Sequence, residues 1–122
     1  MNKILLLLLF VPFIGYGQCK KKETDKNKEG TYIGCMNDER EYHGNGIFTW
    51  KNGNKYDGEW KNGVINGRGE FITNYTNNQG FEVKSTYNGG FVDGTKRGEG
   101  GEEITEFTKG KDRQIWTQKG EF

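Results

Sequence analysis

Residues 44–69 read GNGIFTWKNGNKYDGEWKNGVINGRG, and this stretch predicts the fold of the whole chain. It contains a template of one tyrosine, one tryptophan and four glycines: Tyr56, Gly58, Trp60, Gly63, Gly67 and Gly69. A second copy keeps every spacing: Tyr87, Gly89, Phe91, Gly94, Gly98 and Gly100. A looser copy precedes both, with its last two glycines one residue late: Tyr32, Gly34, Met36, Gly44 and Gly46. The copies start 24 and then 31 residues apart, so an internal repeat builds the chain.

The repeat has the two-residue period of a β-strand. Along Lys55–Lys61, alternation of side chains places Tyr56, Gly58 and Trp60 on one face and four charged residues on the other. An aromatic face opposite a charged face is typical of an antiparallel sheet with one side in water. A glycine on a neighbouring strand leaves room for each ring, and the ring compensates for the weak strand propensity of glycine.

Turn signals separate these strands. Asn52-Gly53 and Asn62-Gly63 predict tight hairpin turns, because both residue types tolerate positive φ, and Asp93-Gly94 repeats the signal.

The template closely resembles the MORN repeat (membrane occupation and recognition nexus) over roughly residues 30–110. The resemblance implies that each repeat is a β-hairpin and that successive hairpins pair side by side. The predicted fold is therefore all-β, a single-layer antiparallel sheet of about three repeats plus a C-terminal capping hairpin. The resemblance implies less about function, since related repeats occur in lipid-kinase accessory regions, in proteins that join two membranes and beside catalytic domains.

Two segments depart from the template. Residues 73–79 are an insertion, and we expect a lengthened hairpin in which Glu70–Asn74 pairs with Phe81–Ser85. Residues 103–117 are predicted to form the capping hairpin around Lys109–Asp112, because terminal repeats are commonly atypical.

Composition limits the size of the core and the classes of partner. The 122 residues allow one small domain, and 31% hydrophobic with 14% aromatic residues fits a thin sheet better than a two-layer core. Removal of residues 1–17 would take Lys3 away and leave 17 basic against 17 acidic residues. A neutral chain has no bulk attraction for nucleic acid, and we expect no nucleic-acid partner.

The N-terminus predicts export. Residues 1–17 have the charged start and the short apolar run of a signal peptide, and residues 18–29 read as a charged flexible linker before the repeat domain at 30–122. Cys19 leaves two outcomes open, lipidation as in bacterial lipoproteins or ordinary cleavage after Gly17. The ending before Cys19 resembles signal peptides of Bacteroidetes-type bacteria, so the expected location is the periplasm, the outer membrane or the exterior.

The sequence offers few candidates for chemistry. His43 is the single histidine, and we interpret it as a loop residue. Cys35 could pair with Cys19 in an oxidising compartment if Cys19 carries no lipid. The acidic residues Glu99, Glu102, Glu103 and Glu106 are interpreted as a charged edge that discourages strand pairing. We expect no catalytic residues, no metal and no cofactor, and hence no enzyme.

Three binding hypotheses follow. The first is a non-catalytic module for protein partners or self-association through sheet edges, using exposed rings at Trp50, Tyr56, Trp60, Tyr87 and Phe91, unless these rings merely pack on one another. The second is a membrane surface met by Lys51, Lys55 and Lys61, weakened by Asp57 and Glu59. The third is a glycan stacked on the aromatic platform.

Overall fold

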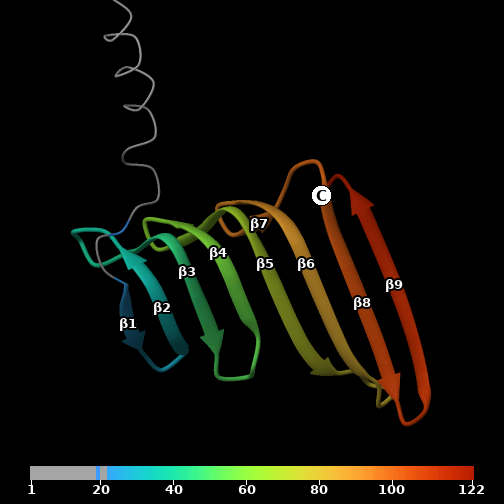
Figure 1. The fold of residues 1–122 in the computed structure, drawn as a ribbon. Helices are drawn as coiled ribbons and strands as arrows, with labels where there is room; N and C mark the ends of the chain where they lie inside the picture. Colours follow the sequence, from blue (N-terminus) through green and yellow to red (C-terminus); the bar gives the residue numbers. More distant parts are fainter. Residues whose placement is uncertain (1–18, 20–21) are drawn as a thin grey trace, which may run out of the picture.

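The computed structural model describes Cys19 and residues 22–122. The signal peptide predicted at 1–17 lies outside the described residues. The described chain forms one antiparallel sheet with the order β1-β2-β3-β4-β5-β6-β8-β9, and the short β7 pairs with β6 (Figure 1). The strands are β1 (Glu23–Lys26), β2 (Gly30–Met36), β3 (Tyr42–Trp50), β4 (Lys55–Lys61), β5 (Val64–Thr76), β6 (Glu82–Val92), β7 (Thr95–Lys96), β8 (Gly101–Lys109) and β9 (Asp112–Gly120). The predicted all-β, single-sheet fold of successive hairpins is confirmed.

Two of the three predicted turns form at the expected dipeptides, whereas Asn52-Gly53 lies in a four-residue connection between β3 and β4 in which Gly53 alone of the pair has positive φ, at 90°. Asn62 and Gly63 have φ of 49° and 84°, and Asp93 and Gly94 have φ of 49° and 81°. Positive φ at both central residues defines a type I′ turn, whose twist matches that of the flanking strands. The Asn-Gly and Asp-Gly dipeptides therefore fix where the chain reverses.

Each repeat tyrosine lies flat along its own strand. The hydroxyls of Tyr32, Tyr56 and Tyr87 donate to the backbone carbonyls of Cys35, Glu59 and Gly90, three residues further on, at 2.6, 2.9 and 2.8 Å. Such a bond satisfies the one polar group of an otherwise buried ring. The spacing of tyrosine and glycine in the template follows from this geometry.

A row of glycines crosses the sheet beneath these rings. Strand pairing aligns Gly34 with Gly46, Gly46 with Gly58, Gly58 with Gly69 and Gly69 with Gly89. A Cβ at Gly46 would lie 2.1 Å from the Tyr32 hydroxyl oxygen, and one at Gly69 would lie 2.4 Å from that of Tyr56. The row must therefore consist of glycine wherever a tyrosine covers it.

The aromatic residues on this face pack edge to face with one another. Trp60 is T-shaped to both Tyr32 and Tyr56, with ring centroids 5.5 and 5.3 Å apart. Phe91 repeats this arrangement between Tyr56 and Tyr87, at 5.3 and 5.1 Å. Edge-to-face packing is the favoured geometry of aromatic pairs. These rings are the core of a sheet that has no second layer among the described residues.

The insertion at 73–79 lengthens the strands more than the turn. Residues 73–76 continue β5 and pair with the start of β6, with Thr76 opposite Glu82 and Thr73 opposite Ser85. The expected hairpin is present, but the expected register is wrong, since Glu70 lies opposite Asn88. β5 continues four residues past Ile72, the partner of the first residue of β4, and the lower ends of β6, β8 and β9 lie below those of β1–β4 (Figure 1). We call this extended part the distal end.

Two details differ from the sequence-based expectation. Residues 23–26, expected as part of a flexible linker, form β1, because pairing with β2 satisfies their backbone and Asp25 accepts a hydrogen bond from the Tyr42 hydroxyl at 2.6 Å. Gly98 and Gly100 lie in the loop before β8, with φ of 104° and 76°. Gly101 takes the place expected of Gly100, and a Cβ there would lie 3.1 Å from the Tyr87 hydroxyl oxygen.

The C-terminal cap is a hairpin with one further contact. β8 and β9 are joined by a two-residue turn between Lys109 and Asp112, as expected. Phe122 then returns to pack edge to face on Tyr87, with centroids 4.9 Å apart. It fills the position beside Tyr87 that Phe91 fills beside Tyr56, so the cap closes the aromatic row.

This ring core predicts sensitivity to alkali. Burial raises the pKa of Tyr32 to about 12, and burial with a hydrogen bond to Asp25 raises that of Tyr42 to about 12, from the usual 10. The unfolded chain loses these protons near pH 10 while the folded chain keeps them, so stability is full below pH 10 and falls between about pH 10 and 12. We expect the urea midpoint to fall across that window.

The measurement is a urea titration at successive pH values, with phenolate absorbance recorded in parallel. Ionisation of every tyrosine near pH 10, with the fold intact, would contradict burial of these rings.

Candidate interaction surface

The rings first proposed as contacts form the core instead. Tyr56, Trp60, Tyr87 and Phe91 are all buried, and Trp50 is half-buried against Phe48 and Phe71. The alternative, in which the rings pack on one another, is therefore correct for four of the five. A partner would have to bind elsewhere.

The exposed rings gather at the distal end. Val83 lies four residues before Tyr87 in β6 and so faces the same side, and pairing places Tyr75, Val83, Phe107 and Gln114 in one row across β5, β6, β8 and β9. Tyr75 is 58% exposed, and Trp116, two residues after Gln114, is 65% exposed. The aromatic face thus continues beyond the repeats. In this part of the described chain no glycines lie beneath the rings, and no other rings pack over them.

A shallow groove of about 210 Å³ lies in this region. Its walls contain three aromatic and three amide side chains: Asn77, Gln79, Phe81, Phe107, Gln114 and Trp116. Lys109 lies at its margin, with its ammonium 5.6 Å from the centre of the Phe81 ring and bonded to the Gln79 carbonyl at 2.8 Å. No charged side chain lines the groove itself, although 29% of the chain is charged. We call it the distal groove.

Strand β9 borders the distal groove and is the last strand of the sheet. All nine of its residues are exposed, and β8 is its one paired neighbour among the described strands. Ile115 and Trp116 are 53% and 65% exposed and lie on opposite faces of the strand. An edge of this kind offers unpaired backbone groups to another strand.

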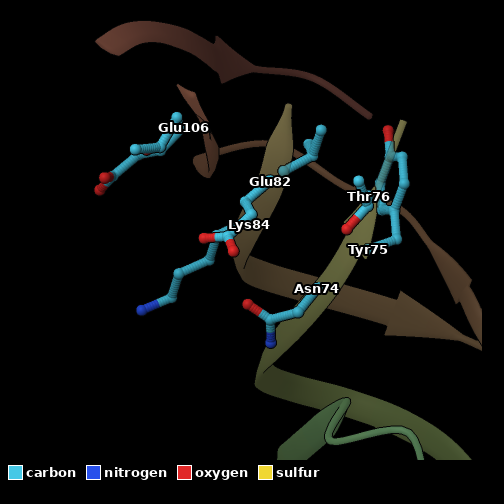
Figure 2. A pocket seen from close by; sticks show the side chains of 8 residues that line it. Asn74, Tyr75, Thr76, Glu82, Lys84 and Glu106 are labelled. Carbon is cyan, nitrogen blue, oxygen red and sulfur yellow. The ribbon is translucent and has the colours of Figure 1, made fainter. Parts of the chain in front are cut away.

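A larger hollow of about 420 Å³ lies on the other face of β5, β6 and β8 (Figure 2). Its polar side chains come from alternate positions of these strands: Asn74, Thr76, Glu82, Lys84, Glu106 and Thr108. Glu106 is bonded to Arg113 at 3.1 Å. Two carboxylates and one ammonium spread over β6 and β8 do not form a converging site.

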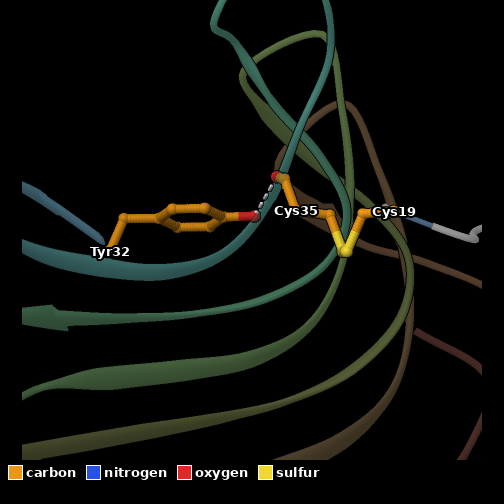
Figure 3. The surroundings of a disulfide bond; sticks show 3 residues. All are labelled: Cys19, Tyr32 and Cys35. Carbon is orange, nitrogen blue, oxygen red and sulfur yellow. Dashed lines mark hydrogen bonds between the residues drawn. A yellow bond between two sulfur atoms is a disulfide. The ribbon is translucent and has the colours of Figure 1, made fainter. Parts of the chain in front are cut away.

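Cys19 and Cys35 form a disulfide (Figure 3). Cys35 lies near the end of β2, at the bulge between Gly34 and Met36, and its carbonyl accepts the Tyr32 hydroxyl bond. The pairing left open by the sequence is thus present. A sulfur in a disulfide cannot also carry a thioether-linked lipid, so the two chemical fates of Cys19 exclude each other.

The remaining candidates for chemistry have structural roles. His43 accepts a hydrogen bond from the Asn62 backbone N–H, at 3.2 Å. Glu103 accepts bonds from Lys96 at 2.6 Å and Ser85 at 2.8 Å, and these outweigh desolvation and lower its pKa. Within the described residues, no group of three or more His, Cys, Asp or Glu side chains could hold a metal ion.

The charged face gives a membrane little to bind. Lys51 and Lys61 are exposed and Lys55 is half-buried, but Asp57 and Glu59 lie between Lys55 and Lys61 on the same face of β4. Among the residues that the structure describes, none belongs to a helix long and apolar enough to span a bilayer.

Comparison with known families identifies the repeat. The MORN repeat family matches residues 41–55 and 56–74. Residues 41–74 contain two MORN repeats. MORN repeats in general are modules that interact with proteins or membranes. Tyr87–Gly101 shows the same tyrosine and glycine geometry outside the matched residues. No curated protein matches the chain closely enough to count as a relative.

The sequence reasoning missed the distal groove. Its residues lie outside the MORN template, in the insertion and in the cap. One signal was available, because Gln114, Trp116 and Gln118 alternate with Ile115 and Thr117 in an uncharged run flanked by charged residues. That run marks an edge strand with no protective charge at its centre.

Proposed function

We propose that this protein is a non-catalytic MORN-repeat module that binds a protein partner at the bacterial cell envelope through its distal groove. The observation that carries the proposal is the position of the exposed rings. The repeat array buries its own aromatic residues, whereas Trp116 and Tyr75 are left 65% and 58% exposed at the distal end.

The groove has the composition of a protein contact. Tryptophan and tyrosine contribute most to binding energy at protein interfaces, and charged residues are depleted at interface centres. The three rings and three amides of the distal groove fit that pattern. The repeats supply a rigid platform, since their rings are locked by edge-to-face contacts and tyrosine hydroxyl bonds.

Export is supported by the disulfide. Disulfides persist in the periplasm and outside the cell and are rare in the cytosol. The Cys19–Cys35 bond therefore favours an exported protein that has lost its signal peptide and carries no lipid on Cys19. Intact mass of the native protein tests this, because the oxidised chain is lighter by two hydrogens and lacks acyl chains.

The test of binding is site-specific crosslinking in native cells. A photoreactive phenylalanine analogue replaces Trp116 in the full-length gene, and the matched control carries it at Val92, which is 53% exposed on another part of the sheet. We expect a covalent protein adduct from position 116 in the envelope fraction and none from position 92. Equal adducts at both positions, or none at position 116, would count against the groove.

One observation supports a second candidate function. Aromatic rings beside uncharged amides also suit a neutral sugar, which stacks on a ring and bonds to amides. Titration with soluble cell-wall oligosaccharides, read by isothermal titration calorimetry, would show saturable binding that is lost in Trp116→Ala if a glycan is the ligand.

A further inference from the structure

We propose that the partner at the distal end is a second copy of this chain, paired antiparallel along β9 about a two-fold axis at Ile115. This inference rests on the proposed function and names the partner of the same site. It follows from the hydrogen-bonding groups of β9, from the contrast between the two edges of the sheet, and from the side chains that each register brings together.

The first step is the direction of the backbone groups of β9. Lys109 and Asp112 flank a two-residue turn, with Gly110 at φ of 58° as its first residue, and such a flanking pair exchanges hydrogen bonds. Hydrogen-bonded and non-bonded pairs alternate along an antiparallel ladder. Arg113, Ile115, Thr117 and Lys119 therefore direct their N–H and C=O groups away from β8.

The second step is that this edge lacks the usual protection. Natural edge strands are short, bulged, interrupted by proline or charged at the centre. β9 has nine residues in unbroken register with β8, and its central run Gln114–Gln118 carries no charge and no proline. Its two largest apolar side chains, Ile115 and Trp116, are more than half exposed.

The third step is the contrast with the opposite edge. β1 has four residues, of which Glu23, Asp25 and Lys26 are charged. Asp25 is held by the Tyr42 hydroxyl, and Glu23 is paired with Arg40 at 3.1 Å. Pairing of β9 with β1 would generate an open filament, but β1 is too short and too charged for it. Pairing of β9 with itself remains, and it closes with two-fold symmetry.

The fourth step fixes the register. A two-fold axis at Trp116 would place Arg113 opposite Lys119 of the second copy, and like charges directly opposite are destabilising. An axis at Ile115 opposes no like charges within β9, and the residue it places opposite Lys119 of the second copy is Lys111, which lies in the turn before β9. It also places Ile115 opposite Ile115 of the second copy, so these two exposed side chains become buried against each other.

The same register completes the distal groove. With the axis at Ile115, Gln114 lies opposite Trp116 of the second copy, on the face that carries Phe107. Opposed residues have their Cβ atoms about 5 Å apart. The second tryptophan therefore covers the open side of the groove along the free edge, and each copy contributes a wall to the other's groove.

The test is the mass of the purified, disulfide-intact mature chain as a function of concentration, by analytical ultracentrifugation. We expect twice the monomer mass at high concentration. Ile115→Lys and Ile115→Glu should each raise the dimer dissociation constant about tenfold or more, because like charges then meet at the axis. An equimolar mixture of the two variants should dimerise again, since lysine then faces glutamate.

Val92→Lys is the matched control, since Val92 and Ile115 are both 53% exposed, and its dimer should be unchanged. A wild-type chain that stays monomeric up to about 1 mM would overturn the inference. So would an Ile115→Lys dimer of unchanged affinity, or a mixture that stays monomeric. A monomeric chain that still crosslinks another protein from position 116 would leave the proposed function standing.

Discussion

Replacing Gly46 by alanine is expected to destabilise the sheet by about 3 kcal/mol, the upper part of the range for overpacking a core. The new Cβ would lie 2.1 Å from the hydroxyl oxygen of Tyr32 and 2.3 Å from its Cζ. Real Cβ atoms do not approach so closely, so the ring or the strand must move.

Neither can move without further loss. Tyr32 is fully buried, stacked on Tyr42 with centroids 3.8 Å apart, and bonded through its hydroxyl to the Cys35 carbonyl. On the other side, the Gly46 carbonyl accepts the indole N–H of Trp60 at 3.1 Å. A shift of Tyr32 leaves the Cys35 carbonyl unpaired, and a shift of β3 breaks the Trp60 bond.

The measurement is urea and thermal unfolding followed by tryptophan fluorescence, with a fall in Tm of roughly 12 °C or more expected. Gly110→Asn is the control, because nothing lies within 4 Å of a Cβ there and asparagine tolerates its φ of 58°. That variant should stay within about 0.5 kcal/mol of wild type. Equal stability of the two variants would show that the Gly46 row is not packed against rings.

The fold was predictable because each local signal of the repeat agrees with the others. The two-residue period of Tyr56, Gly58 and Trp60, the Asn62-Gly63 turn and the glycine spacing all specify one hairpin. Consistency of this kind makes a short sequence pattern decisive. The prediction weakened where a single residue shifted the register, as at Gly101, because Gly98, Gly100 and Gly101 offer several equivalent alignments.

The exposure of side chains was not predictable in the same way. Alternation places Tyr56 and Trp60 on one face, but it does not say whether that face is covered. Cover comes from rings on neighbouring strands, such as Phe71 and Phe91 around Tyr56, and those contacts depend on register across the sheet. The distal groove depends on register as well, since it joins a turn after β5 to the cap strand β9.

The order of β1 shows a related limit. Residues 23–26 contain no apolar side chain, so composition predicts no stable structure there. Their order comes from partners distant in sequence, namely the backbone of β2 and the hydroxyl of Tyr42. A strand whose stability is supplied entirely by its neighbours carries no signal of its own.

The second large effect is expected from Tyr56→Ala, which should destabilise the protein by about 4 kcal/mol. Tyr56 is fully buried and touches Trp60 and Phe91 edge to face, each at 5.3 Å between centroids. Its loss opens a cavity between two repeats and orphans the Glu59 carbonyl, which accepts its hydroxyl at 2.9 Å. Small domains have free energies of unfolding of about 5–15 kcal/mol, so this one substitution would remove a large part of the protein's stability.

Two further substitutions separate the contributions. Tyr56→Phe keeps the ring and removes the hydroxyl bond, and should cost about 1 kcal/mol. Tyr75→Ala removes a tyrosine that is 58% exposed, and should change stability by about 0.5 kcal/mol or less. Urea unfolding of the three variants, compared with wild type, gives the order Tyr56→Ala, Tyr56→Phe, Tyr75→Ala from most to least destabilised.

This order decides which rings are free to bind. If Tyr56→Ala and Tyr75→Ala proved equally mild, the repeat tyrosines would not be the core, and the aromatic face of the array would again be a candidate contact surface. If Tyr56→Ala strongly destabilises the protein and Tyr75→Ala does not, the repeat tyrosines form the core of the sheet. A single layer can bury these rings only by packing them against one another. Partner contacts then belong to rings that the repeat does not use, and Trp116 on the free edge of β9 is the most exposed of these.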